Sequence, residues 1–151
     1  MQSTEENGKG ACERTIESPA GRWMAAAWLP VAAYMALIFY LSSLPHPDEQ
    51  LPKFLFETLG DKLLHAIEYA VLAALSYRAF RRAAGPHAAR YAVVYAAAAA
   101  SFYGMSDEVH QAFVPFRTAT WLDWLADTAG GILGSLTAQR VMERRAKDAI
   151  S

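Results

Sequence analysis

From Trp23 to Leu44 the chain carries no charged residue, and this run limits the possible folds more than any other feature. Its roughly 22 residues would form about 33 Å of helix, enough to cross the hydrocarbon core of a bilayer. A soluble core helix of this length would normally show a polar stripe. Aromatic residues lie towards both ends, as is common at membrane interfaces. We therefore expect a membrane span with a slight kink at Pro30.

Three further apolar runs follow, and charged residues, 19% of the chain, gather mainly in the tails and in short clusters between the runs. A chain of 151 residues is long enough for about four spans. The predicted fold class is all-α, an integral membrane four-helix bundle. The expected segments are a disordered tail at 1–22, a membrane domain at 23–141 with its later spans at 62–80, 88–105 and 121–141, and a charged tail at 142–151. A short interfacial helix is expected near 54–56.

Lysine and arginine positions set the expected orientation, because cytoplasmic connections of membrane proteins are enriched in these residues. Both tails and the second connection carry several of them. The first connection has only Lys53 and Lys62, and the third has only Arg117. We therefore expect a multi-pass protein of the cell membrane, with both termini cytoplasmic and connections one and three outside.

The net charge of −1 gives no basic field for nucleic acid, and no nucleic-acid-binding motif is present. The expected partner is the lipid bilayer. The single cysteine, Cys12, cannot form an internal disulfide or supply a four-cysteine metal site.

The ionisable residues that we expect to be buried within the later spans all fall in the outer half. In a helix, His65, Glu68 and Tyr69 share one face of the second span, and Asp107 and Gln111 are one turn apart at the end of the third. Ionisable residues in or near a span are costly and usually functional. The sequence predicts one acidic cavity that opens outward, with Arg117 at its rim. Its expected members are His65, Glu68, Tyr69, Asp107, Glu108, Gln111, Asp123 and Asp127.

Structural explanations for some of these residues remain open. Glu68 and His65 could form a buried pair that fixes helix packing. Asp123 could be a helix N-terminal residue that the dipole stabilises. Asp107 and Glu108 are harder to explain in this way, because two anions at a helix C-terminus are electrostatically unfavourable.

The same residues form three motifs that resemble the VanZ-like family of membrane proteins, over roughly residues 25–140. The motifs are His65-x-x-Glu68-Tyr69, then Asp107-Glu108-x-x-Gln111-x-Phe113-x-Pro115-x-Arg117, then Asp123-x-x-x-Asp127-x-x-Gly130 with Gly134. The family takes its name from a protein associated with low-level teicoplanin resistance, and the resemblance implies an integral membrane protein with several helices. The family usually has glycine between the proline and the arginine, where this chain has Phe116.

The cluster allows three functions. The first is an enzyme that acts at the outer leaflet on a lipid-linked envelope precursor or a lipoglycopeptide, with a divalent cation such as Mg²⁺, Mn²⁺ or Zn²⁺, or a shared proton, among the acids. The second is a protein that binds or masks a lipid or drug, or modulates a partner. The third is a proton-coupled transporter, which the lack of polar residues in the inner halves of the spans disfavours. The candidate catalytic residues are His65, Glu68, Asp107, Glu108 and Asp127, and the candidate substrate-binding residues are Tyr69, Gln111, Arg117 and Asp123.

Overall fold

The computed structural model of the chain describes residues 19–45 and 60–151, and within these ranges it is α-helical without any β-strand. The helices are α1 (Pro19–Ser42), α4 (Asp61–Ala83), α5 (Gly85–Arg90), α6 (Ala92–Gln111) and α7 (Trp121–Asp148). This confirms the all-α prediction.

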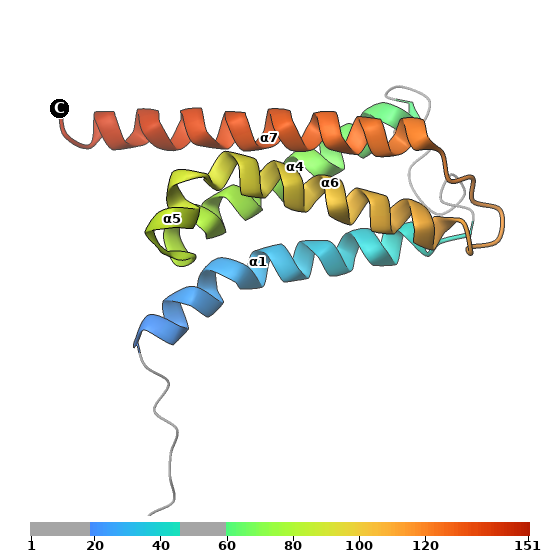
Figure 1. The fold of residues 1–151 in the computed structure, drawn as a ribbon, viewed down its shortest axis with the longest axis horizontal. Coiled ribbons are helices and arrows are strands. Elements are labelled where there is room, and N and C mark those ends of the chain that lie inside the picture. Colours follow the sequence, from blue (N-terminus) through green and yellow to red (C-terminus); the bar gives the residue numbers. More distant parts are fainter. Residues whose placement is uncertain (1–18, 46–59) are drawn as a thin grey trace, which may run out of the picture.

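The four long helices lie roughly along one axis, with α1 and α6 running in one direction and α4 and α7 in the other (Figure 1). Helix α4 is the central element, since it packs against α1, α6 and α7. The C-terminal ends of α1 and α6 therefore meet the N-terminal ends of α4 and α7 at the same end of the bundle (Figure 1). This is the end where the acidic motifs lie.

The α4–α7 pair forms the most extensive helix contact, and two glycines of α7 make it possible. A Cβ atom added at Gly130 would overlap the backbone carbonyl of Ala66, and one added at Gly134 would overlap that of Ala70. Only residues without a side chain allow two backbones to approach so closely. This Gly-x-x-x-Gly pair therefore serves packing within the chain.

Several helix bounds differ from those expected. Helix α1 begins at Pro19, earlier than Trp23, and contains Pro30. The third long helix begins at Ala92 rather than near Ala88, because Tyr91 leaves the helical conformation, with φ −105° and ψ 22°, and separates α5 from α6. We find no sequence signal for this break.

The other changes concern the two ends of the predicted membrane domain. Helix α7 continues past Val141 to Asp148, so most of the expected charged tail is helical. Its residues are mainly good helix formers, and Gln139 donates a hydrogen bond to Glu143 one turn later, at 2.9 Å. The expected interfacial helix near 54–56, and the tail as far as residue 18, lie outside the described residues.

Among the described helices, α1 alone is long and apolar enough to cross a membrane by composition, over Trp23–Ser42. The other long helices contain too many charged or weakly apolar residues to meet the same criterion. The first expected span is thus supported by its composition in the folded chain, whereas the arrangement of four spans belongs to the proposal below.

Candidate functional site

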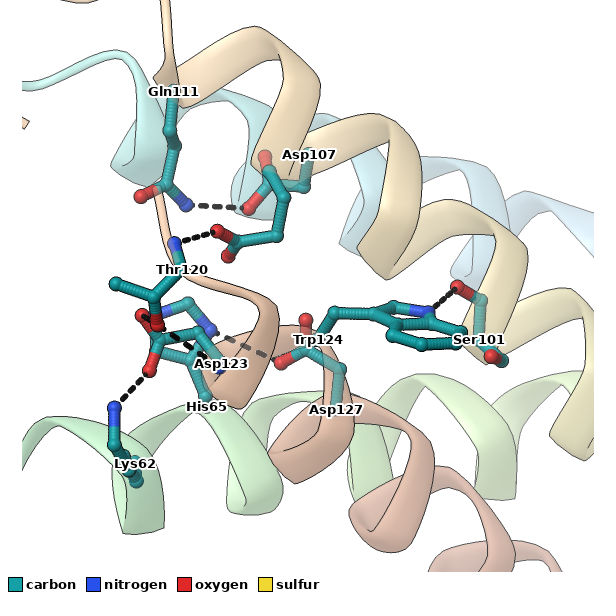
Figure 2. Close-up of polar contacts among 10 residues, drawn as sticks. Lys62, His65, Ser101, Asp107, Gln111, Thr120, Asp123, Trp124 and Asp127 are labelled. Carbon is teal, nitrogen blue, oxygen red and sulfur yellow. Dashed lines mark hydrogen bonds and ion pairs between the residues drawn. The ribbon is translucent and has the colours of Figure 1, made fainter. Parts of the chain in front are cut away.

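His65, Glu108 and Asp127 come from α4, α6 and α7 and meet at the end of the bundle where α4 and α7 begin. Figure 2 shows His65 and Asp127 in contact there. The Nδ1 atom of His65 lies 3.0 Å from Oδ1 of Asp127. One potential ligand atom from each of the three residues lies within 4.8 Å of the other two. All three residues are buried, and Asp127 is completely inaccessible to solvent. These three residues form what we call the central triad.

Two oxygen atoms of the central triad have no hydrogen-bond partner within the described parts of the chain. They are Oε1 of Glu108 and Oδ2 of Asp127, and both are buried. Buried polar atoms almost always have partners, because an unmet hydrogen bond costs about 1–3 kcal/mol. Two such atoms beside a histidine indicate a place for a proton, a water molecule or a cation.

Glu108 lies beyond Met105, the end of the expected third span. Burial raises the pKa of its carboxyl group to about 6, although a hydrogen bond from the backbone N–H of Thr120 to Oε2, at 2.8 Å, acts in the opposite direction. A carboxyl group that titrates near neutrality can accept and release a proton during a reaction.

Gly104 provides the space that Asp127 occupies. A Cβ atom at this position would lie 2.7 Å from Oδ2 of Asp127. Gly104 is one helical turn before Glu108, so its missing side chain allows α6 to bring Glu108 close to the other two triad residues. We did not predict a role for Gly104, and an isolated glycine within an apolar helix was the available signal.

Asp123 has a structural role at the start of α7. Its carboxylate pairs with Lys62 at 2.6 Å and accepts a hydrogen bond from the hydroxyl of Thr120, also at 2.6 Å (Figure 2). Thr120 is the N-cap of α7, and its hydroxyl in turn accepts from the backbone N–H of Asp123. This reciprocal cap favours the structural explanation for Asp123. Lys62 and Thr120 were absent from the predicted site.

Asp107 and Gln111 form the contact expected from their one-turn spacing. The side-chain amide of Gln111 donates a hydrogen bond to Oδ2 of Asp107 at 2.8 Å, and both residues are buried (Figure 2). This bond partly compensates the burial of Asp107 at the unfavourable end of the helix dipole.

Glu68 and Tyr69 lie deeper in the bundle than Lys62 and His65, on α4. Within the described residues, Glu68 makes no hydrogen bond or ion pair, so the alternative of a Glu68–His65 pair is not realised; His65 pairs with Asp127 instead. Tyr69 is fully buried and its hydroxyl has no hydrogen-bond partner there. Its ring centroid lies 6.4 Å from that of Tyr103, which places Tyr69 in the hydrophobic core.

Arg117 holds the end of α1. Its guanidinium donates hydrogen bonds to the carbonyl oxygens of Leu41, at 3.0 Å, and Ser42, at 3.3 Å. The last carbonyl groups of a helix accept no hydrogen bond from the helix itself, and a positive charge beside them is electrostatically favourable. The structure thus gives Arg117 a capping contact with α1, and its role in binding substrate stays a prediction.

Phe116, directly before Arg117, has a φ of +65°, a conformation that residues with a side chain rarely adopt. Glycine adopts it without strain, which gives a physical reason for glycine at this position in the family that the motifs resemble. The substitution by phenylalanine has not prevented Arg117 from reaching α1.

An apolar cavity of about 340 Å³ lies beside the central triad, between the end of α6 and the start of α7. Among the described residues, Glu108 is the only charged one in its wall, which is otherwise formed by Met105, Val109, Ala112, Ala119, Thr120, Trp121 and Trp124. The indole N–H of Trp124 donates to the carbonyl of Ser101 at 3.1 Å, and this bond fixes part of the wall (Figure 2). A largely apolar cavity with one reactive polar group is typical of a site for an apolar or amphiphilic ligand.

Comparison with known proteins gives one match. The model of the family described as VanZ/LLP1 matches residues 26–142, which is most of the chain. Searches of curated proteins and of solved structures found no match.

Replacing Phe116 with glycine should stabilise the protein. The left-handed conformation costs a residue with a side chain about 1–2 kcal/mol, and the greater flexibility of glycine offsets part of the gain. We expect a net gain of about 0.5–1 kcal/mol, measured as a higher thermal midpoint in detergent.

Phe113→Gly is the matched control, because Phe113 is similarly exposed, at 83% against 78% for Phe116, and has no positive φ. It should leave stability unchanged or lower it. An equal shift in both variants would show that backbone strain at Phe116 is not the cause.

Proposed function

Because this chain belongs to the VanZ/LLP1 family, we propose that it is a multi-pass membrane protein with both termini in the cytoplasm that acts on the cell envelope. In this proposal the central triad holds a divalent cation at the outer end of the bundle. The site then carries out metal- or acid/base-assisted chemistry on an amphiphilic substrate of the outer leaflet. The physiological result is lower sensitivity to lipoglycopeptide antibiotics such as teicoplanin.

The distribution of apolar side chains supports the membrane location. Only 17% of the apolar window in α1 is buried within the chain, so this helix is not covered as the core helix of a soluble protein would be. Large apolar side chains are also exposed on the other long helices, for example Leu63 on α4, Phe102 on α6 and Leu133 on α7. Lipid would cover these surfaces, which would otherwise be unfavourable in water.

The observation that carries the proposed chemistry is the pair of buried oxygens without partners, Oε1 of Glu108 and Oδ2 of Asp127, beside His65. Two carboxylates at this separation cannot both remain ionised in a buried site unless a cation or a proton lies between them. Carboxylate and imidazole groups suit Mn²⁺ or Zn²⁺, and the carboxylates also suit Mg²⁺. Such an ion would polarise a phosphoryl or carbonyl oxygen of the substrate.

The apolar cavity beside Glu108 supports an amphiphilic substrate. Its wall can take an acyl or prenyl chain while the polar part of the same molecule reaches the central triad. A lipid-linked envelope precursor and a lipoglycopeptide both combine these two parts. If the site holds a proton in place of a cation, Glu108 is placed to act as a general base at the boundary between the apolar and polar parts.

A binding or masking function is the second candidate. Four of the predicted site residues already have structural partners: Asp107 and Gln111 pair with each other, Asp123 pairs with Lys62, and Arg117 contacts α1. The groups that remain for chemistry are therefore few, and a ligand could be held by them without reaction. A proton-coupled transporter is disfavoured, because the inner halves of α4, α6 and α7 contain no buried carboxylate or histidine.

Metal analysis tests the cation. Wild-type protein purified with Mn²⁺ or Zn²⁺ present should retain about one ion per chain. Glu108→Gln and Asp127→Asn should each weaken binding at least about tenfold, because each removes a ligand. Equilibrium binding followed by elemental analysis measures this.

Asp123→Asn is the control, because His65 also belongs to a second possible ligand group with Asp61 and Asp123. We expect Asp123→Asn to keep the ion. If it loses the ion while Glu108→Gln keeps it, the second group is the metal site. If the wild-type protein contains no stoichiometric metal, the cation is excluded from the proposal and only acid/base chemistry remains.

Teicoplanin susceptibility tests the function. A sensitive host that produces the wild-type protein should tolerate more teicoplanin than one with an empty vector. Glu108→Gln, at a matched level in the membrane, should lose this protection, and Asp123→Asn should retain it. Equal protection by wild type and Glu108→Gln would favour masking over chemistry, and no protection by either would contradict the antibiotic role.

Cysteine labelling tests the orientation. In a Cys12→Ser background, Phe113→Cys places a thiol in the third connection, and Ser151→Cys places one at the C-terminal end; both positions are exposed. A membrane-impermeant maleimide should label Phe113→Cys in intact cells and label Ser151→Cys only after permeabilisation. The reverse pattern would invert the proposed topology.

A further inference from the structure

A second cavity lies between α4 and α7, towards the end of the bundle opposite the central triad, and it has a volume of about 630 Å³. Its floor contains small residues such as Ala74 and Gly134, and its sides contain Val71, Leu133 and Val141, which are 40%, 64% and 43% exposed. The volume is in the range of about 300–1,000 Å³ that is usual for ligand sites. We call this cavity the inner groove.

Three arginines lie at one end of the inner groove. Arg78 and Arg82 are one turn apart on α4, and Arg145 reaches the same cavity from α7. Within the described residues their guanidinium groups make no ion pair or hydrogen bond, and no acidic residue lines the groove. Like charges one turn apart repel each other. A bound anion would relieve this repulsion.

The helix dipole explains only part of this arrangement. Arg82 and Arg145 lie in the last turns of their helices, where positive charge is favourable. That effect acts on each helix separately and does not require side chains of two helices to share one apolar cavity. Arg81 lies in the last turn of α4 as well, without facing the groove.

The dimensions of the groove fit one leaflet of a bilayer. From Val71 to Arg82 it follows α4 for roughly 16 Å. Half of a typical hydrocarbon core is about 15 Å. An acyl chain along Val71 and Leu133 would therefore bring its phosphate to the level of the three arginines.

We infer that the inner groove binds one anionic phospholipid, with an acyl chain against its apolar sides and the phosphate on Arg78, Arg82 and Arg145. Guanidinium groups bind phosphate oxygens through paired, charge-assisted hydrogen bonds. Basic pockets between helices on the cytoplasmic side of membrane proteins take such headgroups. With the proposed orientation, the lipid comes from the cytoplasmic leaflet, and the site is separate from the central triad.

Native mass spectrometry of the full chain tests this inference. The protein is released from micelles that contain equal amounts of phosphatidylglycerol and phosphatidylcholine. Wild-type protein should retain one phosphatidylglycerol in at least fivefold preference to phosphatidylcholine. The variant Arg78→Gln/Arg82→Gln/Arg145→Gln should lose this preference, and Ala74→Leu, which fills the groove without changing charge, should retain less of either lipid.

The matched control is Arg81→Gln/Arg140→Gln/Arg144→Gln, which removes the same charge from the same two helices outside the groove. It should keep the wild-type preference. An equal loss in the control would show that the preference comes from general electrostatic attraction to anionic lipid, without a specific site. Displacement of the lipid by millimolar glycerol phosphate would show a site for a soluble phosphate, and a dimer without retained lipid would show that a second copy of the chain covers the groove. Either result would overturn the inference.

Discussion

The close contact of α4 with α7 is the interaction on which the site depends. Gly130 and Gly134 allow the backbone of α7 to reach the carbonyls of Ala66 and Ala70, so the two helices pack in one register. His65 immediately precedes Ala66, and Asp127 lies on α7 less than one turn before Gly130. The 3.0 Å contact between His65 and Asp127 therefore follows from backbone packing. The Lys62–Asp123 pair repeats the same register one turn closer to the N-terminal ends of both helices.

Helix α6 adds an unfavourable contact to the site, because it brings the carboxylate of Glu108 towards that of Asp127. Gly104 gives Asp127 its space, and the same close approach places Glu108 beside it. Asp107 and Asp123 have compensating partners, whereas the central triad keeps two buried oxygens without any in the described residues. A buried anion without a partner is strongly unfavourable, so a ligand that meets these two oxygens would be stabilised there.

The sequence predicted the convergence of the site because that convergence depends on local patterns. Helical spacing places His65, Glu68 and Tyr69 on one face, and the alternation of basic connections places the acidic motifs at one end. The roles of Arg117 and Lys62 could not be predicted in the same way, because each depends on a partner far away in the sequence, and helical spacing contains no information about such contacts. The role of Thr120 had a local signal, because Thr120 stands three residues before Asp123, the spacing of a capping box. The break at Tyr91 likewise has no signal in the sequence, whereas the Gly-x-x-x-Gly spacing of Gly130 and Gly134 is a pattern typical of close helix packing.

The opposite charges at the two ends of the α4–α7 pair have a common physical origin. Both helices begin at the acidic end and finish at the arginine end (Figure 1). Their aligned dipoles favour anions near Asp123 and cations near Arg82 and Arg145. The dipoles explain the sign of the charge at each end. They do not require that charge to be unpaired, since Asp123 at the acidic end forms an ion pair with Lys62. Where the described residues supply no such partner, at the central triad and at the inner groove, a bound molecule would supply the missing charge.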